Sequence, residues 1–208
     1  MSKITLVGGT WSAKTDPTLA QWEHPGSQFS RWLQEFGIYP LEPAPFFWSG
    51  HLDGICGNDL DWHEAANNLA YRLIQHPPED RNVFAHSHGG TVAVLAATKV
   101  PINNLVTAGT PIRKKTDDKG REAMQRHMIR GWYHLYAPGG FWADKMQALG
   151  SLFDGRWGLR RTFDIPGVEN IGVTGIDHST VLYDRRQFDR ALVQGGVIPF
   201  LRGEGMGV

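Results

Sequence analysis

The sequence predicts an α/β fold, an open and mostly parallel sheet of about six strands with helices on both faces. Short apolar runs alternate along the chain with longer segments of helical periodicity, which is the pattern of repeated strand–helix units. Glycine and proline account for 25 and 12 of the 208 residues and separate these segments at turns. The length is typical of one domain, so we expect residues 1–208 to form a single unit.

The first part of the chain contains three strand–helix units. An apolar run at 4–7 predicts a strand that ends at Gly8-Gly9. Aromatic and leucine side chains then recur at helical spacing until Gly37, and a longer apolar stripe ends at Pro77-Pro78. The elements expected here are a strand at 4–7, a helix around 29–36, a strand at 38–41, a helix over 59–75, a strand at 82–85 and a helix to about 99.

The second part continues the alternation with weaker signals. Branched and aromatic residues predict the strands, and a charged stretch that begins at Arg113 precedes the next helical pattern. The elements expected here are a strand at 105–108, a helix around 121–129, strands at 132–136 and 171–174, and a helix within 184–194.

Composition excludes several classes of partner and location. Lys plus Arg and Asp plus Glu each total 21, so nothing predicts binding to nucleic acid or to an anionic membrane. The apolar run at 4–7 is too short for a secretory signal or a membrane span. The single cysteine, Cys56, cannot form an internal disulfide, which fits a reducing compartment, and we therefore expect a cytoplasmic protein.

The segment Ala-His-Ser-His-Gly-Gly at 85–90 carries the strongest functional signal. A buried strand runs directly into Ser87, and an Ala/Val-rich helix follows, which is the context of a nucleophile elbow. Ala85 and Gly89 are small, as the close approach of strand and helix at such a turn requires. The helix N-terminus favours developing negative charge. The segment therefore predicts Ser87 as a nucleophile.

Other interpretations of this segment remain open. Ser87 has the residue type of an ordinary helix N-cap. His86 and His88 have the spacing of a metal-binding pair, as in a metal-dependent hydrolase, although no Asp-His pair follows them and His63-Glu64 does not continue as His-Glu-x-x-His. A catalytically silent, hydrolase-like binding module is a further alternative.

A serine nucleophile needs a base, and the base needs an orienting acid. His178 follows the last expected strand and is the expected base, whereas His127 and His134 fall within predicted elements and are expected to pack or lie on the surface. Asp144 lies in the loop after the strand at 132–136 and is the expected acid, with Asp154 and Asp164 as alternatives.

Backbone amides and aromatic side chains complete the predicted site. The oxyanion donors are expected to be the N–H groups of His88 and of Thr10, in the glycine-rich loop after the first strand. That loop lacks the Gly-x-Gly-x-x-Gly pattern of a nucleotide site. Three tryptophans in loops near this edge are candidates to line an acyl pocket, with simple packing as the alternative: Trp11, Trp48 and Trp142.

Taken together, these motifs resemble the α/β-hydrolase superfamily, in particular its small lipase/esterase-like members. Gly-Gly-Thr-Trp at 8–11 resembles the oxyanion loop, 85–90 resembles a lipase elbow that begins with alanine, and 106–111 is similar to the following strand that ends in Gly-Thr-Pro. The segments 136–150 and 177–179 resemble the acid and histidine loops. Gly8 stands where these enzymes often have histidine.

The resemblance implies a minimal six-stranded sheet and hydrolysis of a carboxylic ester through an acyl-enzyme on Ser87. It implies a small-molecule acyl substrate and no metal or cofactor. Amide, thioester and carbon–carbon bond cleavage occur on the same fold, and the triad alone does not distinguish them.

Overall fold

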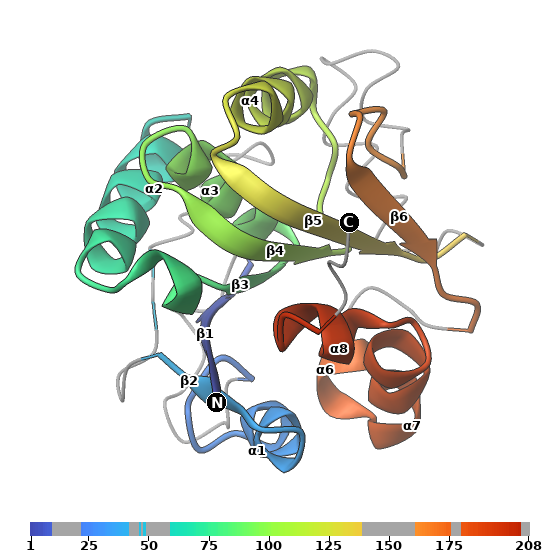
Figure 1. The fold of residues 1–208 in the computed structure, drawn as a ribbon. Helices are drawn as coiled ribbons and strands as arrows, with labels where there is room; N and C mark the ends of the chain where they lie inside the picture. The colour runs from blue at the N-terminus through green and yellow to red at the C-terminus, as the bar shows by residue number, and fades with distance from the viewer. Residues whose placement is uncertain are drawn as a thin grey trace.

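The centre of the fold is a six-stranded parallel sheet, here described in a computed structural model. The structure describes residues 1–9, 22–41, 46, 48, 59–138, 161–175 and 180–204. The strands are β1 (Ser2–Val7), β2 (Ile38–Pro40), β3 (Val83–His86), β4 (Ile102–Ala108), β5 (Ile129–Tyr136) and β6 (Val168–Gly172). Their order is β2-β1-β3-β4-β5-β6, and every neighbouring pair is parallel (Figure 1). The predicted parallel sheet is confirmed.

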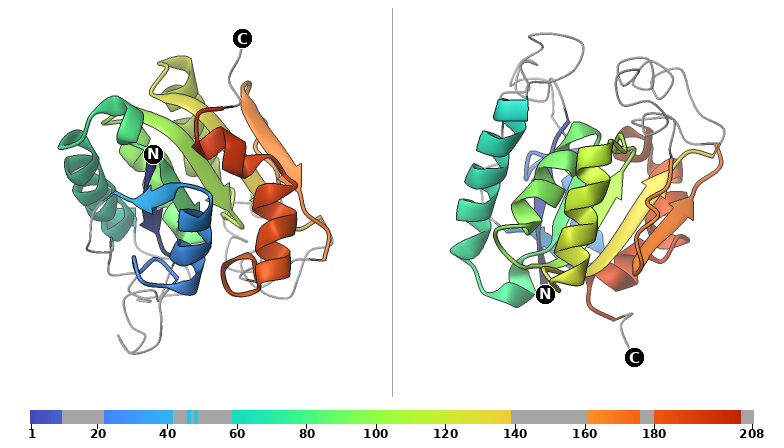
Figure 2. Two further views of the ribbon diagram at one scale, coloured as in Figure 1. Left: turned by 60° about the horizontal axis from the view of Figure 1, so that its bottom comes forward. Right: turned by 90° about the horizontal axis from the view of Figure 1, so that it is seen from above.

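Helices cover both faces of this sheet, also as predicted (Figure 2). One face carries α2 (Asp59–Ile74), α3 (His88–Ala97) and α4 (Lys114–Gln125). The other face carries α1 (Gln28–Glu35), α6 (Thr180–Tyr183), α7 (Arg185–Phe188), the π-helical turn η3 (Asp189–Val193) and α8 (Val197–Leu201). A short 3₁₀ turn, η1 (Pro78–Asp80), precedes β3. None of the described helices is both long and apolar enough to cross a lipid bilayer.

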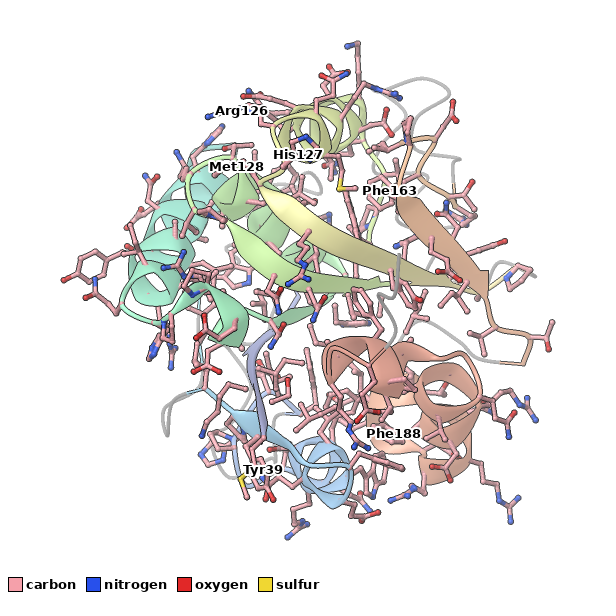
Figure 3. All side chains as sticks on the ribbon, in the orientation of Figure 1. Tyr39, Arg126, His127, Met128, Phe163 and Phe188 are labelled. Carbon is pink, nitrogen blue, oxygen red and sulfur yellow. The ribbon has the colours of Figure 1, made fainter. Side chains whose placement is uncertain are left out.

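Two apolar cores lie on the two faces, because successive strand residues point to opposite sides. Along β3, Val83 and Ala85 join one core, and Phe84 between them joins the other. Figure 3 shows Phe163 and Phe188 on opposite sides of the sheet, one in each core. Burial on both faces explains why the strands could be recognised as apolar runs.

The helix α4 differs from its prediction at both ends. It begins at Lys114 rather than near residue 121, and Ile129 already belongs to β5. Its buried face is made of small and polar residues, so no apolar stripe marks its start; a Cβ on Gly120 would lie 2.9 Å from the Trp132 ring. His127, expected within a helix, lies in the turn after α4 with a φ of 54°.

The C-terminal strand and the final helix also differ from their predictions. The last strand begins at Val168, three residues before its expected start, because this edge strand is half-exposed and partly polar. The expected helix within 184–194 is confirmed, since α7 continues directly into the π-helical turn η3 and together they run from Arg185 to Val193. The helix α8, which the sequence did not predict, follows Gly196, where a φ of 74° interrupts the preceding helical turns.

Candidate active site

The candidate site lies where the strand order reverses. β1 has β2 on one side and β3 on the other, and in open α/β sheets ligands bind outside the carboxyl ends of the strands at such a point. Gly8 and Gly9 directly follow β1, and Ser87 directly follows β3. The topology therefore brings the predicted oxyanion loop and the predicted nucleophile to one edge.

Ser87 adopts a strained backbone conformation. Its φ of 55° and ψ of −134° lie outside the regions that L-residues favour, a type of strain that typically costs about 1–3 kcal/mol. The turn is held from both sides, since the Ser87 N–H donates to the Ala108 carbonyl at 2.9 Å and the Gly90 N–H donates to the Ser87 carbonyl at 3.0 Å. Such strain is characteristic of a nucleophile elbow.

Ser87 does not have the geometry of an ordinary N-cap, although it precedes α3. Its side chain makes no capping hydrogen bond to the helix. Ser27 provides a comparison within the same chain, because it caps α1 with φ −65° and ψ 162° and its hydroxyl accepts from the Ser30 N–H at 3.0 Å. The capping interpretation of Ser87 therefore does not explain the conformation.

Glycines surround the elbow because backbone atoms leave no room for a Cβ. A Cβ on Gly89 would lie 2.5 Å from the Gly8 carbonyl oxygen and 2.6 Å from the Val7 carbonyl oxygen. A Cβ on Gly9 would lie 2.7 Å from the Ser87 Cβ and 3.2 Å from its Oγ. The close approach is thus between α3 and the end of β1, and the chain after β1 passes directly beside Ser87.

The two histidines that flank Ser87 pack against different tryptophans. His86 contacts Trp22 edge-on with ring centroids 6.1 Å apart, and His88 stacks on Trp62 at 5.5 Å and 23°. Trp22 and Trp62 belong to the cores on opposite faces of the sheet. This arrangement favours separate packing roles over a shared metal ion. Among the described residues, no group of three or more His, Cys, Asp or Glu could hold a metal.

A cation lies close to this stack. The Arg113 guanidinium carbon is 5.0 Å from the centroid of the Trp62 ring, a cation–π distance. Trp62 itself is only 3% exposed. His88 is therefore held by the Trp62 side chain from α2, and Trp62 in turn contacts Arg113 at the start of α4. The spacing of Trp62 on its helix indicates a core position and does not reveal this contact with His88.

Trp48 contacts the chain after β1 in a way that the sequence did not reveal. It is 5% exposed, and its indole N–H donates a hydrogen bond of 2.8 Å to the Gly8 carbonyl. A parallel bridge between Val7 and Phe46 brings this segment beside the end of β1. The two bonded residues are 40 positions apart, so no local pattern could predict the pair.

Other predicted site residues fall outside the described residues and stay predictions. They are Thr10, Trp11, Trp142, Asp144, the alternative acid Asp154, and His178. The alternative acid Asp164 is described; it is exposed, and its carbonyl accepts a hydrogen bond of 2.6 Å from Arg121.

His134, the alternative to His178 as a base in the sequence, is buried inside the protein. It is 1% exposed on β5, with Nδ1 2.9 Å from the Thr107 hydroxyl and Nε2 3.0 Å from the Arg161 carbonyl. The Arg161 carbonyl only accepts, so Nε2 carries the proton and Nδ1 accepts from Thr107. Thr107 in turn accepts from the Trp132 indole at 2.9 Å. Burial lowers the pKa of His134 to about 4, so the ring is neutral.

Comparisons with known proteins identify the fold. No protein-family model and no curated protein matches the sequence. Among solved structures, a predicted CIB-like hydrolase from Thermoplasma acidophilum aligns with a TM-score of 0.56 at 12% identity, over 97% of this chain and 86% of that one. An α/β hydrolase from the metagenome of lagoon sediments at Mar Chica, Morocco, aligns with a TM-score of 0.53 at 12% identity, over 93% of this chain and 90% of that one.

A third structure, MenH from S. aureus, aligns at a TM-score of 0.51 and 13% identity, over 98% of this chain and 94% of that one. These likenesses extend over nearly the whole of each chain, and the neighbours share the α/β-hydrolase fold. The chain therefore has the fold of the α/β-hydrolase superfamily, as its motifs implied.

Proposed function

We propose that this protein is a serine hydrolase that cleaves a carboxylic ester through an acyl-enzyme on Ser87. The observation that carries the proposal is the strained conformation of Ser87, at the reversal of strand order and beside Gly9. An ordinary N-cap has extended backbone angles, as Ser27 has before α1, whereas a nucleophile elbow requires the positive φ that Ser87 adopts. Neighbours of this fold that are named as hydrolases support the reaction class.

In the proposed mechanism, the Ser87 Oγ attacks the ester carbonyl while His178 takes its proton. Asp144 holds the imidazole in the correct tautomer and stabilises the imidazolium that forms. The C–O bond of the tetrahedral intermediate then breaks, and the leaving alcohol receives the proton from His178. Water, deprotonated by the same imidazole, attacks the acyl-enzyme. The bond between the acyl carbon and the Ser87 Oγ then breaks, the imidazolium returns its proton to that oxygen, and the carboxylic acid is released.

The carbonyl oxygen becomes negatively charged in the tetrahedral intermediate, and backbone donors are expected to stabilise it. His88 occupies the first position of α3, where N–H groups lack partners within the helix. The Thr10 N–H is the second proposed donor. Removing one donor of this kind typically lowers turnover by about 10²–10³-fold. The stacking of the His88 ring on Trp62 restricts the movement of His88, the first proposed donor.

Covalent labelling of Ser87 tests the proposal. The purified chain is treated with a fluorophosphonate, and intact-mass analysis is applied to the wild type, Ser87→Ala and Ser27→Ala. We expect a single adduct on the wild type and on Ser27→Ala and none on Ser87→Ala. Ser27 is the matched control because it is a buried serine that precedes a helix with ordinary backbone angles.

An unlabelled but folded wild-type protein would contradict the proposal and support a catalytically silent binding module. Labelling that persists in Ser87→Ala would assign the nucleophile to another residue. Loss of ester turnover on addition of a chelator would support the metal-dependent alternative at His86 and His88.

A further inference from the structure

We propose that Trp48 is a positioning residue for the reaction at Ser87, because its indole N–H orients the peptide group between Gly8 and Gly9. This inference rests on the proposed function and deepens it. It gives Trp48 a role distinct from lining an acyl pocket, since the side chain is 5% exposed and its polar atom is bonded to Gly8.

The contact has the properties of a restraint on the backbone. The bond between Trp48 Nε1 and the Gly8 oxygen is 2.8 Å long and buried, so water does not compete for it. A peptide group is planar, and the carbonyl of Gly8 and the N–H of Gly9 belong to the same plane. Fixing the direction of the Gly8 carbonyl therefore also fixes the direction of the Gly9 N–H.

A second neighbour limits the same carbonyl from the side of α3. A Cβ on Gly89 would lie only 2.5 Å from the Gly8 oxygen, so that oxygen lies against the first turn of the helix. The carbonyl is thus held between the indole of Trp48 and the start of α3. Any rotation of the peptide group would break the hydrogen bond or press the oxygen against the helix.

This restraint acts beside the nucleophile. Gly9 is close enough to Ser87 that a Cβ would lie 3.2 Å from the Oγ. Gly8 and Gly9 have no side chains with which to anchor themselves, and glycine has the widest range of backbone angles. The chain here needs a restraint from elsewhere in the fold, and the structure assigns that task to Trp48.

Loss of this restraint is expected to destabilise the transition state more than it weakens substrate binding. Donors to an oxyanion act by being oriented before the reaction begins, and their effect appears as charge develops on the oxygen. If the peptide group between Gly8 and Gly9 rotates, the chain that leads from β1 to the predicted donor Thr10 starts in a different direction. An interaction lost only in the transition state lowers kcat and leaves KM unchanged.

The test removes the indole N–H and keeps the ring. Trp48→Phe does this approximately, and 3-benzothienylalanine incorporated at position 48 does it with nearly the same shape. We expect kcat for an activated ester to fall about tenfold with KM within twofold, which corresponds to about 1.4 kcal/mol of transition-state stabilisation. Trp32→Phe is the matched control, because Trp32 is similarly buried but belongs to α1 and packs against Phe188.

Each outcome decides the inference. An unchanged kcat in the folded benzothienyl variant would overturn it, and a raised KM with unchanged kcat would place Trp48 on the substrate wall instead. A similar loss in Trp32→Phe would show a general effect of removing an indole. Failure of the proposed function is distinguishable, because the wild type would then show neither ester turnover nor a fluorophosphonate adduct on Ser87.

Discussion

Acidification should destabilise this protein through one buried side chain, His134 on β5. The ring is 1% exposed, and burial lowers its pKa from 6.5 to about 4, although its hydrogen bond to the backbone carbonyl of Arg161 acts in the opposite direction. Between these two pH values the unfolded chain binds a proton at His134 and the folded chain does not. The free energy of unfolding therefore falls as the pH falls through this window.

The size of the effect follows from the shift in pKa. Each pKa unit corresponds to about 1.36 kcal/mol, so a displacement from 6.5 to about 4 predicts a loss of about 3 kcal/mol between pH 7 and pH 4. The stability that the neutral His134 ring contributes is fully present at pH values above 6.5, the pKa of the unfolded state. Such a loss is a large part of the stability of a typical domain, about 5–15 kcal/mol.

Urea unfolding followed by circular dichroism, at intervals between pH 4 and pH 8, measures this loss. The control is His134→Gln, whose amide can accept from Thr107 and donate to Arg161 but does not titrate. The wild type and the variant have all other titratable groups in common, so the difference between their curves of unfolding free energy against pH isolates His134. We expect the wild type to lose about 3 kcal/mol more than the variant. Parallel curves would refute the reasoning.

Two further predictions concern the elbow. Gly89→Ala should lower the free energy of unfolding by about 2–3 kcal/mol and slow labelling of Ser87, because its Cβ would meet two carbonyl oxygens of the chain at and after β1. Gly26→Ala, with no atom nearer than 3.5 Å, should change stability by less than about 0.5 kcal/mol, and equal effects would contradict the argument. Ser87→Gly should be more stable than Ser87→Ala by about 1 kcal/mol in thermal unfolding, since glycine tolerates a φ of 55°; the reverse order would indicate that position 87 is unstrained.

Patterns within a few residues of each other predicted that the strands exist, and that a turn at Ser87 joins a strand to a helix, although several strand starts differ from their predictions. β1 and β3 are apolar because both faces of the sheet are buried, and the glycine at position 89 of α3 follows from its contact with the end of β1. These constraints act on the segment itself, so they can be read in its composition. The order from strand to Ser87 to helix is likewise local.

Elements whose burial depends on a distant partner were harder to predict. The part of α4 before residue 121 has no apolar stripe, because Gly120 faces the Trp132 ring and polar residues form the rest of its buried face. The final helices are divided by Gly196 at positive φ, and the sequence does not show that α8 resumes beyond it. In α4 the neighbour, and not the segment, decides the structure.

By itself, the sequence determined the class of the fold, the position of the elbow and the residue types around it, because strand periodicity and turn chemistry are local properties. The tertiary structure alone decided which side chains support that elbow. Trp48 meets Gly8, and Trp62 meets His88, across separations that no periodic pattern spans. Packing also decided that His134 is neutral, since the cost of burying its charge depends on everything that surrounds it.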